Sequence, residues 1–373
     1  MRKKRQHRFV VLGGVGTIGR VVVRDLLASD PGHRVVVADF NLAKALEFVR
    51  SLRSRRARPV FADASKPVAL AGVMRGADVV VNCTQHDFNM IVMRAALRAG
   101  VHYVDLGGLF HWTRRQRKLD VAFKRAGLTA VIGMGCAPGI TNVLTQFGAE
   151  QMQRVNSVRI RVGARNLGPQ SNEFSFPYSA QTIVEELTLK PWVFEKGNFR
   201  QTPPRGGWEH VKFPEPVGPV WVVRTRHSEV ATIPVSLKHK GIKFCDFKVG
   251  FDRAFVREVM KMIRTGWTID RFRPLTAAAG QAHDVEMARV TVTGQCDGRR
   301  VKLTLDCLAR SRRSWKASAG DIDTGCPPSI VAQMIASGAI VRRGVSAPET
   351  VVPVAEFLRE ARQRGMQFFL EAG

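Results

Sequence analysis

The sequence predicts an α/β protein with an N-terminal, doubly wound parallel sheet and a second, α+β domain built on a mostly antiparallel sheet. Two patterns carry this prediction. Between Phe9 and Met134, apolar strands alternate with helix-like segments, which is typical of a parallel sheet covered by helices. Beyond Gly148, extended segments follow one another, and the Asp297-Gly298 pair between two of them is a strong hairpin signal.

The first domain, residues 1–145, contains six predicted strands. They are FVVL, RVVVADF, PVFADA, ADVVVNCTQ, VHYVDLGG and LTAVIGMG, with helices after the glycines and near residues 42–52, 68–75, 89–100 and 115–125. In a doubly wound sheet, ligands bind outside the carboxyl ends of the strands. We therefore expect one crevice formed by the loops that follow Leu12, Asp39, Asn82, Asp105 and Met134.

The first strand breaks directly into the glycines of FVVLGGVGTIG. Gly14, Gly16 and Gly19 fit the G-x-G-x-x-G pattern of a Rossmann dinucleotide-binding turn. The first glycine permits a tight turn, the second lets the backbone approach a pyrophosphate, and the third lets helix and strand pack closely. Free N–H groups at the helix start, around Thr17 and Ile18, are expected to face the phosphates.

Asp39 ends the second predicted strand, at the place where an acidic side chain accepts hydrogen bonds from the adenosine ribose. A 2′-phosphate beside this carboxylate would put two anions at hydrogen-bonding distance, which is unfavourable without a cation. The predicted cofactor is therefore NAD. NADP stays an alternative because basic residues follow, although we expect most of them on a solvated face: Lys44, Arg50, Arg53, Arg55, Arg56 and Arg58.

The second domain, residues 146–325, is predicted to be an α+β substrate and dimerisation domain. It opens with the extended segment VNSVRIRVGA and the helix SAQTIVEEL. Further strands are predicted at Trp221–Val230, Lys243–Val249, Ala288–Gly294 and Arg300–Cys307. The segments PSIVAQMIASGAI and PVAEFLREARQRG have helical spacing, and we expect residues 326–373 to return to the first domain.

Composition narrows the classes of function. The 373 residues are 45% apolar and 24% charged, as in a globular protein of two domains. No apolar run approaches the roughly 20 residues needed to cross a bilayer, and no signal-peptide core is visible, so we expect a cytoplasmic protein without membrane contact. The six cysteines lack metal or disulfide spacing, so we expect no metal. A net charge of +27 is typical of a protein that binds nucleic acid, but no recognition motif supports that function here.

Several motifs in a fixed order carry a resemblance to a known family. They are GGVGTIG, AALRAGVHYVDLGG, GMGCAPGITN, YSAQTIVEE, FPEPVG, HSEVATIP and TGCPPSIVAQMI, and they extend over nearly the whole chain. Together they resemble the saccharopine dehydrogenase superfamily, most closely its lysine 6-dehydrogenase-like branch. The resemblance implies a Rossmann domain with a discontinuous substrate domain, a nicotinamide cofactor, a homodimer, and hydride transfer from a carbon that bears an amine.

One loop bears on the branch within that superfamily. Saccharopine reductases typically have an acidic residue before Pro-Gly, where this chain has Ala137 before Pro138-Gly139. The loop therefore looks more like the lysine 6-dehydrogenase type. Its Pro-Gly resembles the start of a helix, which would aim N–H groups at a carboxylate or carboxamide.

Three residues are candidates for acid–base chemistry: Asp105, His227 and Glu229. Oxidising an amine needs a hydride acceptor, a base and a dry site. Asp105 is predicted at the carboxyl end of a strand, where it reaches an amine or, alternatively, caps the Gly107-Gly108 turn. On a predicted strand, His227 and Glu229 would face the same side and relay a proton, the alternative being a surface ion pair.

The other candidate residues follow from their loops. Those expected at the cofactor, besides the glycine turn and Asp39, are Asp63, Thr84 and His86. Those expected at an amino-acid or polyamine-like substrate are Cys136, Thr141, Asn142, Tyr178, Ser179 and Thr182. A substrate carboxylate would be met by a guanidinium from Arg159, Arg165 or Arg224. Glu185 and Glu186 are expected on a helix surface.

The leading hypothesis is a dehydrogenase that oxidises the C–N bond of a lysine-type amino acid by hydride transfer to NAD. The first alternative is a saccharopine or carboxynorspermidine-type reductase, which would form a secondary amine instead of releasing ammonia. An alternative of another class is a non-catalytic NAD-binding or regulatory protein.

Overall fold

The structure is a computed structural model that describes residues 6–168, 174–276 and 283–373. It divides into two compact units. The first comprises Met1–Val143 and Asp321–Arg364, and the second Leu144–Gly320 and Gly365–Gly373. Each unit has its own sheet, and each is described by itself.

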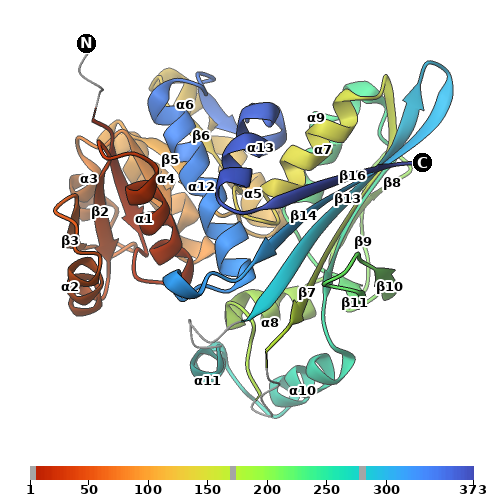
Figure 1. Cartoon of the computed structure of the whole chain (residues 1–373), viewed down its shortest axis with the longest axis horizontal. Helices are drawn as coiled ribbons and strands as arrows, with labels where there is room; N and C mark the ends of the chain where they lie inside the picture. The colour runs from red at the N-terminus through yellow and green to blue at the C-terminus, as the bar shows by residue number, and fades with distance from the viewer. Residues whose placement is uncertain (1–5, 169–173, 277–282) are drawn as a thin grey trace. The chain divides into compact units, whose positions relative to one another are not determined.

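The first unit is built on a parallel sheet, which has seven strands in the described part of the chain (Figure 1). The strand order is β15-β6-β5-β4-β1-β2-β3. Chain order runs β1 (Arg8–Leu12), β2 (Arg34–Asp39), β3 (Ala57–Phe61), β4 (Val79–Asn82), β5 (His102–Asp105), β6 (Thr129–Val131) and β15 (Gly344–Ser346). Because β1 lies between β2 and β4, the order reverses there, and ligands bind at such a switch point.

Helices connect these strands as the alternation predicts. They are α1 (Thr17–Ser29), α2 (Leu42–Ser51), α3 (Pro67–Met74), α4 (Asn89–Ala99), α5 (Phe110–Gln116) and α6 (Asp120–Arg125). Later in the chain, most of α12 (Ala319–Ser337) and all of α13 (Val354–Gln363) belong to the same unit. The helix α7 (Ile140–Glu150) follows β6 and crosses the boundary between the units.

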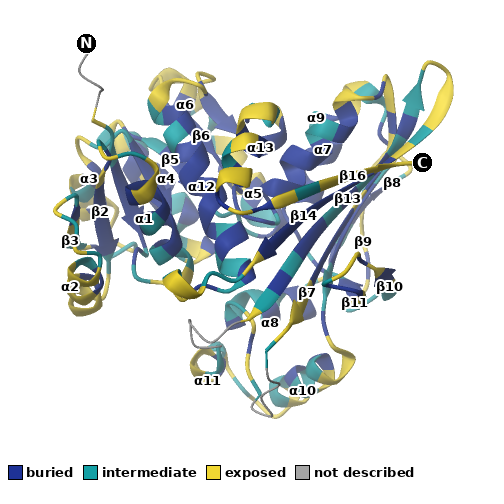
Figure 2. Cartoon of the chain, viewed as in Figure 1, coloured by how far each residue is buried: buried dark blue, intermediate teal, exposed yellow. Residues whose placement is uncertain are grey.

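The core of the first unit is formed by valine-rich strands. Val10, Val36 and Val80 lie in register on β1, β2 and β4, and each is at most 2% exposed. A parallel sheet covered on both faces requires such continuous apolar strands. In Figure 2 the strand β2 is accordingly dark blue along most of its length.

The second unit is built on a mixed sheet of nine strands among the described residues. Its main path is β10-β11-β12-β7-β13-β14-β16, and β8 pairs with β12 and β9. The strands are β7 (Arg154–Asn166), β8 (Trp192–Glu195), β9 (Asn198–Gln201), β10 (Glu209–Lys212), β11 (Pro219–Arg224), β12 (Phe244–Gly250), β13 (Asp284–Cys296), β14 (Arg299–Arg310) and β16 (Gln367–Ala372). Its helices are α8 (Ala180–Thr188), α9 (Glu229–Ser236), α10 (Arg253–Arg264) and α11 (Ile269–Phe272).

The predicted fold class is confirmed. In the second sheet β12 and β7 are parallel, and the other neighbours are antiparallel. The predicted hairpin joins β13 to β14, and Asp297 and Gly298 both have positive φ, of 49° and 72°. This is the backbone of the type I′ turn that an Asp-Gly pair favours.

Two details of the predicted secondary structure were wrong. The strand expected to reach Val230 ends at Arg224, and Glu229 begins α9 instead. The end of the chain forms β16, which pairs antiparallel with β14 in the second unit, so the expected return of residues 326–373 to the first domain fails for Gly365–Gly373. Both errors concern places where tertiary contacts outweigh the local pattern.

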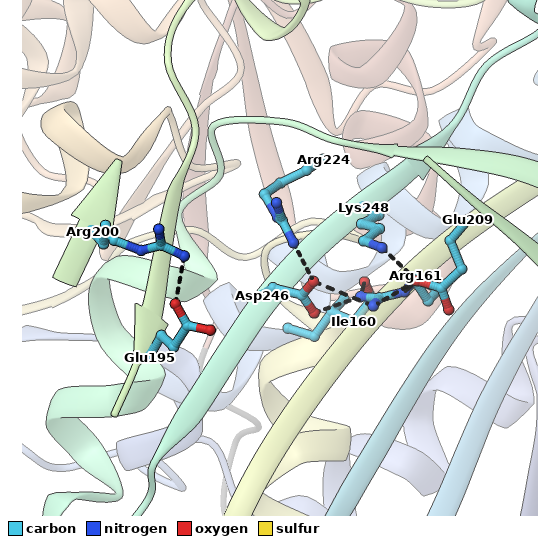
Figure 3. Close-up of polar contacts among 8 residues, drawn as sticks. All are labelled: Ile160, Arg161, Glu195, Arg200, Glu209, Arg224, Asp246 and Lys248. Carbon is cyan, nitrogen blue, oxygen red and sulfur yellow. Dashed lines mark hydrogen bonds and ion pairs between the residues drawn. The ribbon is translucent and has the colours of Figure 1, made fainter. Parts of the chain in front are cut away.

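A partly buried network of charges crosses the second sheet (Figure 3). Arg161 on β7 is 4% exposed and donates to Asp246 on β12 through Nη1, at 2.7 Å, and through Nη2, at 3.3 Å. Its Nε donates to Glu209 at 3.0 Å, and Glu209 also accepts from Lys248 at 2.6 Å. Arg161 and Lys248 are direct neighbours in the strand register, where like charges destabilise. The carboxylates of Asp246 and Glu209 therefore offset the repulsion between these two neighbouring cations.

The glycine turn of the first unit is shaped by close backbone packing. Gly13, rather than Gly14, has the left-handed φ, of +68°. A Cβ on Gly14 would lie 2.8 Å from the Val37 side chain, and one on Gly19 would lie 2.1 Å from the Gly13 carbonyl oxygen. The third glycine of the motif is thus required for contact between α1 and the turn, as the pattern predicts.

We expect Gly19→Ala to destabilise the first unit and Gly72→Ala not to. Both glycines lie within helices, but a Cβ on Gly72 would meet nothing within 4 Å. Gly72→Ala should therefore raise the free energy of unfolding by about 0.5–1 kcal/mol, whereas Gly19→Ala should lower it by about 1–3 kcal/mol because backbone must move. Thermal or urea unfolding measures both changes, and equal effects of the two substitutions would contradict this account of the turn.

Candidate functional site

Asp39 ties the end of β2 to the glycine turn. Its Oδ2 accepts from the Val15 N–H at 3.1 Å, and its Oδ1 accepts from the Asn41 N–H at 2.9 Å. The carboxylate thus lies beside the turn, where the motif predicts the adenosine ribose. Several basic residues made NADP an alternative cofactor. One of them, Arg56, donates to the Asp30 and Leu27 carbonyls at the end of α1, at 2.9 Å each. The others are exposed: Lys44, Arg50, Arg53, Arg55 and Arg58.

A chain of buried hydrogen bonds joins the carboxyl ends of β4 and β5. The Thr84 hydroxyl donates to Asn82 Oδ1 at 2.6 Å, and Asn82 Nδ2 donates to Asn89 at 2.9 Å and to the Tyr103 hydroxyl at 3.2 Å. The Tyr103 hydroxyl in turn donates to Asp105 Oδ2 at 2.8 Å. This chain fixes the loop that carries Thr84 relative to the strand that carries Asp105.

Asp105 is the centre of this edge of the sheet and is 1% exposed. Its Oδ1 accepts from the backbone N–H of Gly133 at 2.7 Å and of Gly107 at 2.9 Å. Its Oδ2 accepts from Tyr103 and from Gln116 Nε2 of α5. Burial raises the pKa of Asp105 above its ordinary value, although these four donors oppose the shift. With each oxygen held by two donors, the carboxylate is suited to positioning the loops after β5 and β6 rather than to reaching an amine.

The other candidate residues of the first unit have mixed surroundings. His86 is buried, with its ring 6.2 Å from that of Trp112. Asp63 is partly exposed, and hydrogen bonds from the side chain and backbone of Ser65 lower its pKa. Asn142 accepts from the Gly139 N–H at 2.9 Å and donates to Glu349 at 2.7 Å, so it caps the start of α7. Cys136 and Thr141 are buried. Contact of these residues with cofactor or substrate stays a prediction.

A second cluster lies within the second unit and brings together two predicted regions. His227, in the loop before α9, contacts Glu229 through Nδ1, and its Nε2 is 3.7 Å from Glu186 Oε1 of α8. The Tyr178 hydroxyl donates to the other oxygen of Glu186 at 2.5 Å. His227 also stacks on Phe247 of β12, with ring centroids 3.7 Å apart. The predicted His227–Glu229 pair therefore forms, but across a loop and a helix start instead of along a strand.

Burial and charge tune this acid–base cluster, which we define as Tyr178, Glu186, His227 and Glu229. Glu186 is 3% exposed, and burial raises its pKa to about 7, against the opposing effect of His227 and the Tyr178 hydrogen bond. Burial alone would lower the pKa of His227, but the negative charges of Glu229 and Glu186 outweigh the effect of burial, so the pKa of His227 is raised. Burial and Glu186 together raise the pKa of Tyr178. The cluster thus holds a carboxyl group that changes charge near neutral pH, as an acid or base in catalysis must.

Glu186 was wrongly expected on a helix surface. It is buried, as are Ala180, Ile183 and Leu187 of α8, and it lies three residues after Ile183, so these two side chains share a side of the helix. That spacing was visible in the sequence. What the sequence did not show is that His227 and Tyr178 face this position and make burial of a carboxyl group acceptable.

The remaining candidates of the second unit lie outside the cluster. The Ser179 hydroxyl accepts from the Thr182 N–H at 3.4 Å and caps α8. Of the arginines proposed for a substrate carboxylate, Arg224 lies 3.6 Å from Asp246 in the buried network, and Arg165 lies 3.4 Å from Glu215. Arg159 lies over the Phe244 ring at 4.9 Å. None of the three is paired with the acid–base cluster among the described residues.

Comparison with known protein families accounts for both units. The model of the saccharopine dehydrogenase NADP binding domain matches residues 9–131, and that of the saccharopine dehydrogenase C-terminal domain matches residues 135–366. The chain belongs to the saccharopine dehydrogenase family. The resemblance to the saccharopine dehydrogenase superfamily is thereby confirmed, while the branch within it stays a prediction, and the first unit of this family member binds NAD(P).

Characterised relatives of this saccharopine dehydrogenase family member are distant. Carboxyaminopropylagmatine dehydrogenase of Synechocystis sp. is 22% identical over 269 residues, or 69% of this chain and 66% of the relative. Carboxynorspermidine synthase of Vibrio alginolyticus is 22% identical over 254 residues, or 62% of this chain and 60% of the relative. The matched region therefore spans less than two thirds of each relative's length.

A solved structure shares the fold. Saccharopine dehydrogenase (L-Glu forming) from Saccharomyces cerevisiae matches with a TM-score of 0.77 and 15% identity, over 98% of this chain and 100% of that one. In the part of the chain that the structure describes, no helix has both the length and the apolar character needed to cross a membrane.

We expect Asp105→Ala to cost at least about 3 kcal/mol of unfolding free energy, because it leaves four buried donors without their acceptor. Asp105→Asn should cost less, since an amide oxygen still accepts two of these hydrogen bonds. Asp63→Ala, at a partly exposed carboxylate that accepts only the two hydrogen bonds from Ser65, is the control and should cost less than about 1.5 kcal/mol. Urea denaturation gives all three values. Wild-type stability in Asp105→Ala would show that Asp105 does not hold the loops.

Proposed function

We propose that this saccharopine dehydrogenase family member is an NAD(P)-linked oxidoreductase that acts on the C–N bond of an amino-acid-derived amine. The observation that carries the proposal is the acid–base cluster. It offers a carboxyl group with a pKa of about 7 in a dry environment, and amine oxidation or imine reduction needs such a group to move one proton. The bound nicotinamide supplies or accepts the hydride.

Within this proposal, Glu186 is the group that takes or gives the proton. Glu229 holds His227 through Nδ1, and Phe247 keeps its ring in one plane, so that Nε2 faces Glu186. Tyr178 orients Glu186 by donating to its second oxygen. With His227 protonated and both glutamates ionised, the cluster carries one net negative charge, which favours a cationic amine over a neutral one.

The preferred substrate class is a secondary amine that carries a carboxyl group. The names of both relatives denote polyamine derivatives bearing a carboxyl group, and this supports the reductase alternative over the lysine-type hypothesis. The lysine-type substrate remains the second candidate because Ala137 stands where saccharopine reductases typically have an acidic residue. For the cofactor, the carboxylate of Asp39 beside the glycine turn supports a preference for NAD. The homodimer and the cytoplasmic location stay predictions.

An absorbance assay at 340 nm separates these candidates. The purified full chain is incubated with NAD or NADP and with L-lysine, saccharopine, carboxynorspermidine or carboxyaminopropylagmatine, while ammonia is assayed in parallel. We expect NAD reduction with a carboxylated secondary amine and no release of ammonia. Reduction with L-lysine and stoichiometric ammonia would replace this proposal by the lysine-type one, and NADP-only activity would overturn the argument from Asp39. Cofactor binding without turnover in either direction would favour the non-catalytic alternative.

Glu186→Gln tests the role of the cluster, with Glu185→Gln on the same helix as the matched control. Because the Glu185 charge contributes to the raised pKa of Glu186, the control should keep the inflection but move it to a lower pH. We expect Glu186→Gln to lower kcat about 10²–10⁴-fold and to abolish an inflection near pH 7 in kcat/KM. In the wild type, amine oxidation should rise with pH through this inflection, because the base must be ionised. Imine reduction should fall there. An inflection that persists in Glu186→Gln would assign it to another group.

The stability of the same variants gives a readout that does not depend on turnover. Since burial raises the folded-state pKa of Glu186 to about 7 from 4.5, its contribution to stability is complete below about pH 4.5. The contribution is lost as the pH rises through 7, because the unfolded chain releases this proton first. Glu186→Gln should lack this loss between pH 5 and 8, and Glu185→Gln should retain it.

A further inference from the structure

An open groove of about 570 Å³ lies within the second unit, between α10 and the segment that includes Arg205 and Trp208. Of the nine lining residues that the structure describes, five are basic and one, Glu258, is acidic. The basic ones are Arg205, Arg253, Arg257, Lys261 and Arg264. None of them belongs to the acid–base cluster or to the charge network of the sheet.

Four of these cations form a stripe along α10. Arg253, Arg257 and Lys261 follow one another at intervals of four residues, and Arg264 comes three residues later. Like charges at this spacing destabilise a helix, and Arg253 also lies at the positive end of the helix dipole. Glu258 lies 3.9 Å from Lys261, and the side chains are 43% and 68% exposed, so this contact compensates the repulsion little. The stripe is therefore a place where a bound anion would remove repulsion.

Two of the cations are held in fixed positions. The Arg253 guanidinium lies 4.1 Å from the centre of the Trp221 ring and 5.1 Å from that of Trp208. Trp221 in turn contacts the His210 ring at 4.9 Å. Arg205 donates to the Leu187 carbonyl at 2.5 Å. Cations ordered before binding lose less conformational entropy when an anion arrives.

We infer that this groove binds a small molecule that carries at least two phosphate groups. Guanidinium groups recognise phosphate oxygens in pairs, and positions four residues apart on a helix are about 6 Å apart along its axis, which suits successive phosphate groups. A volume of 570 Å³ is in the range of small-molecule sites.

Single-stranded nucleic acid is the competing occupant, and the groove suits it less. Its binding uses aromatic rings as stacking surfaces for bases, whereas Trp208 and Trp221 both present a face to Arg253. The α10 helix is also only twelve residues long, or about 18 Å. The groove is distinct from the acid–base cluster. The opposite side of α10 packs Val259 into an apolar core with Ile183 and Leu187 of α8, and this core lies between α10 and α8.

Calorimetric titration with inorganic tripolyphosphate tests the inference on the full chain. Saturating NAD(P)H is present throughout, so that phosphate cannot bind at the glycine turn. The test variant is Arg257→Glu/Lys261→Glu. The control is Arg94→Glu/Arg98→Glu, an exposed pair of arginines with the same four-residue spacing on α4. Both variants change the net charge equally, so the comparison removes the effect of the strongly basic composition.

We expect the test variant to weaken tripolyphosphate binding at least tenfold and the control less than threefold. Equal weakening in both would show attraction by overall charge only and would overturn the inference. No binding to the wild type would overturn it as well. Binding of a single-stranded oligonucleotide that depends on Arg257 and Lys261, without binding of tripolyphosphate, would assign the groove to nucleic acid. Arg257→Gln/Lys261→Gln repeats the test if the charge-reversal variant shows an altered melting temperature.

Discussion

The buried carboxylate of Asp105 is the constraint on which the carboxyl edge of the parallel sheet depends. Removing an anion from water is costly unless several donors replace the lost hydration. Here the donors come from the loop after β5, the loop after β6, the strand β5 and the helix α5. Because all four must converge on one carboxylate, the paths of two loops at the expected cofactor crevice are fixed together. A single buried charge thus positions groups that are distant in the sequence.

The second unit meets the same constraint in two different ways. In the sheet, Asp246 accepts two hydrogen bonds from one guanidinium, and the pair is fully satisfied. In the acid–base cluster, Glu186 has the Tyr178 hydroxyl and the more distant His227, and this is too little to offset burial. Satisfied charges of the first kind fix the fold, while Glu186 keeps a proton that it can exchange near neutral pH. This contrast supports the proposal that the proton is transferred at Glu186 rather than at Asp246.

The sequence was sufficient for the fold because local signals and global packing agree in most elements. Valine runs such as those of β1 and β4 suit only strands buried on both faces, and Asp297-Gly298 adopts the turn that its residues favour. The site was less accessible. The pairing of His227 with Glu229 was predicted, but on the assumption that both residues lie on one strand, whereas Glu229 begins α9. The burial of Glu186, and the pairing of β16 with β14, depend on residues far away in the chain, which no local pattern contains.

The proposed preference for NAD depends on Asp39, the same carboxylate that shapes the glycine turn. One oxygen of this carboxylate holds the Val15 N–H within the turn, and the other holds Asn41 just before α2. Asn41 in turn accepts from the Lys44 N–H at 3.0 Å and caps α2. A substitution that removed the negative charge in order to admit a 2′-phosphate would therefore also release the turn and the start of α2. In this chain a change to NADP would need a replacement acceptor for two backbone N–H groups as well as a new cation, so the proposed preference for NAD rests on the same bonds that build the turn.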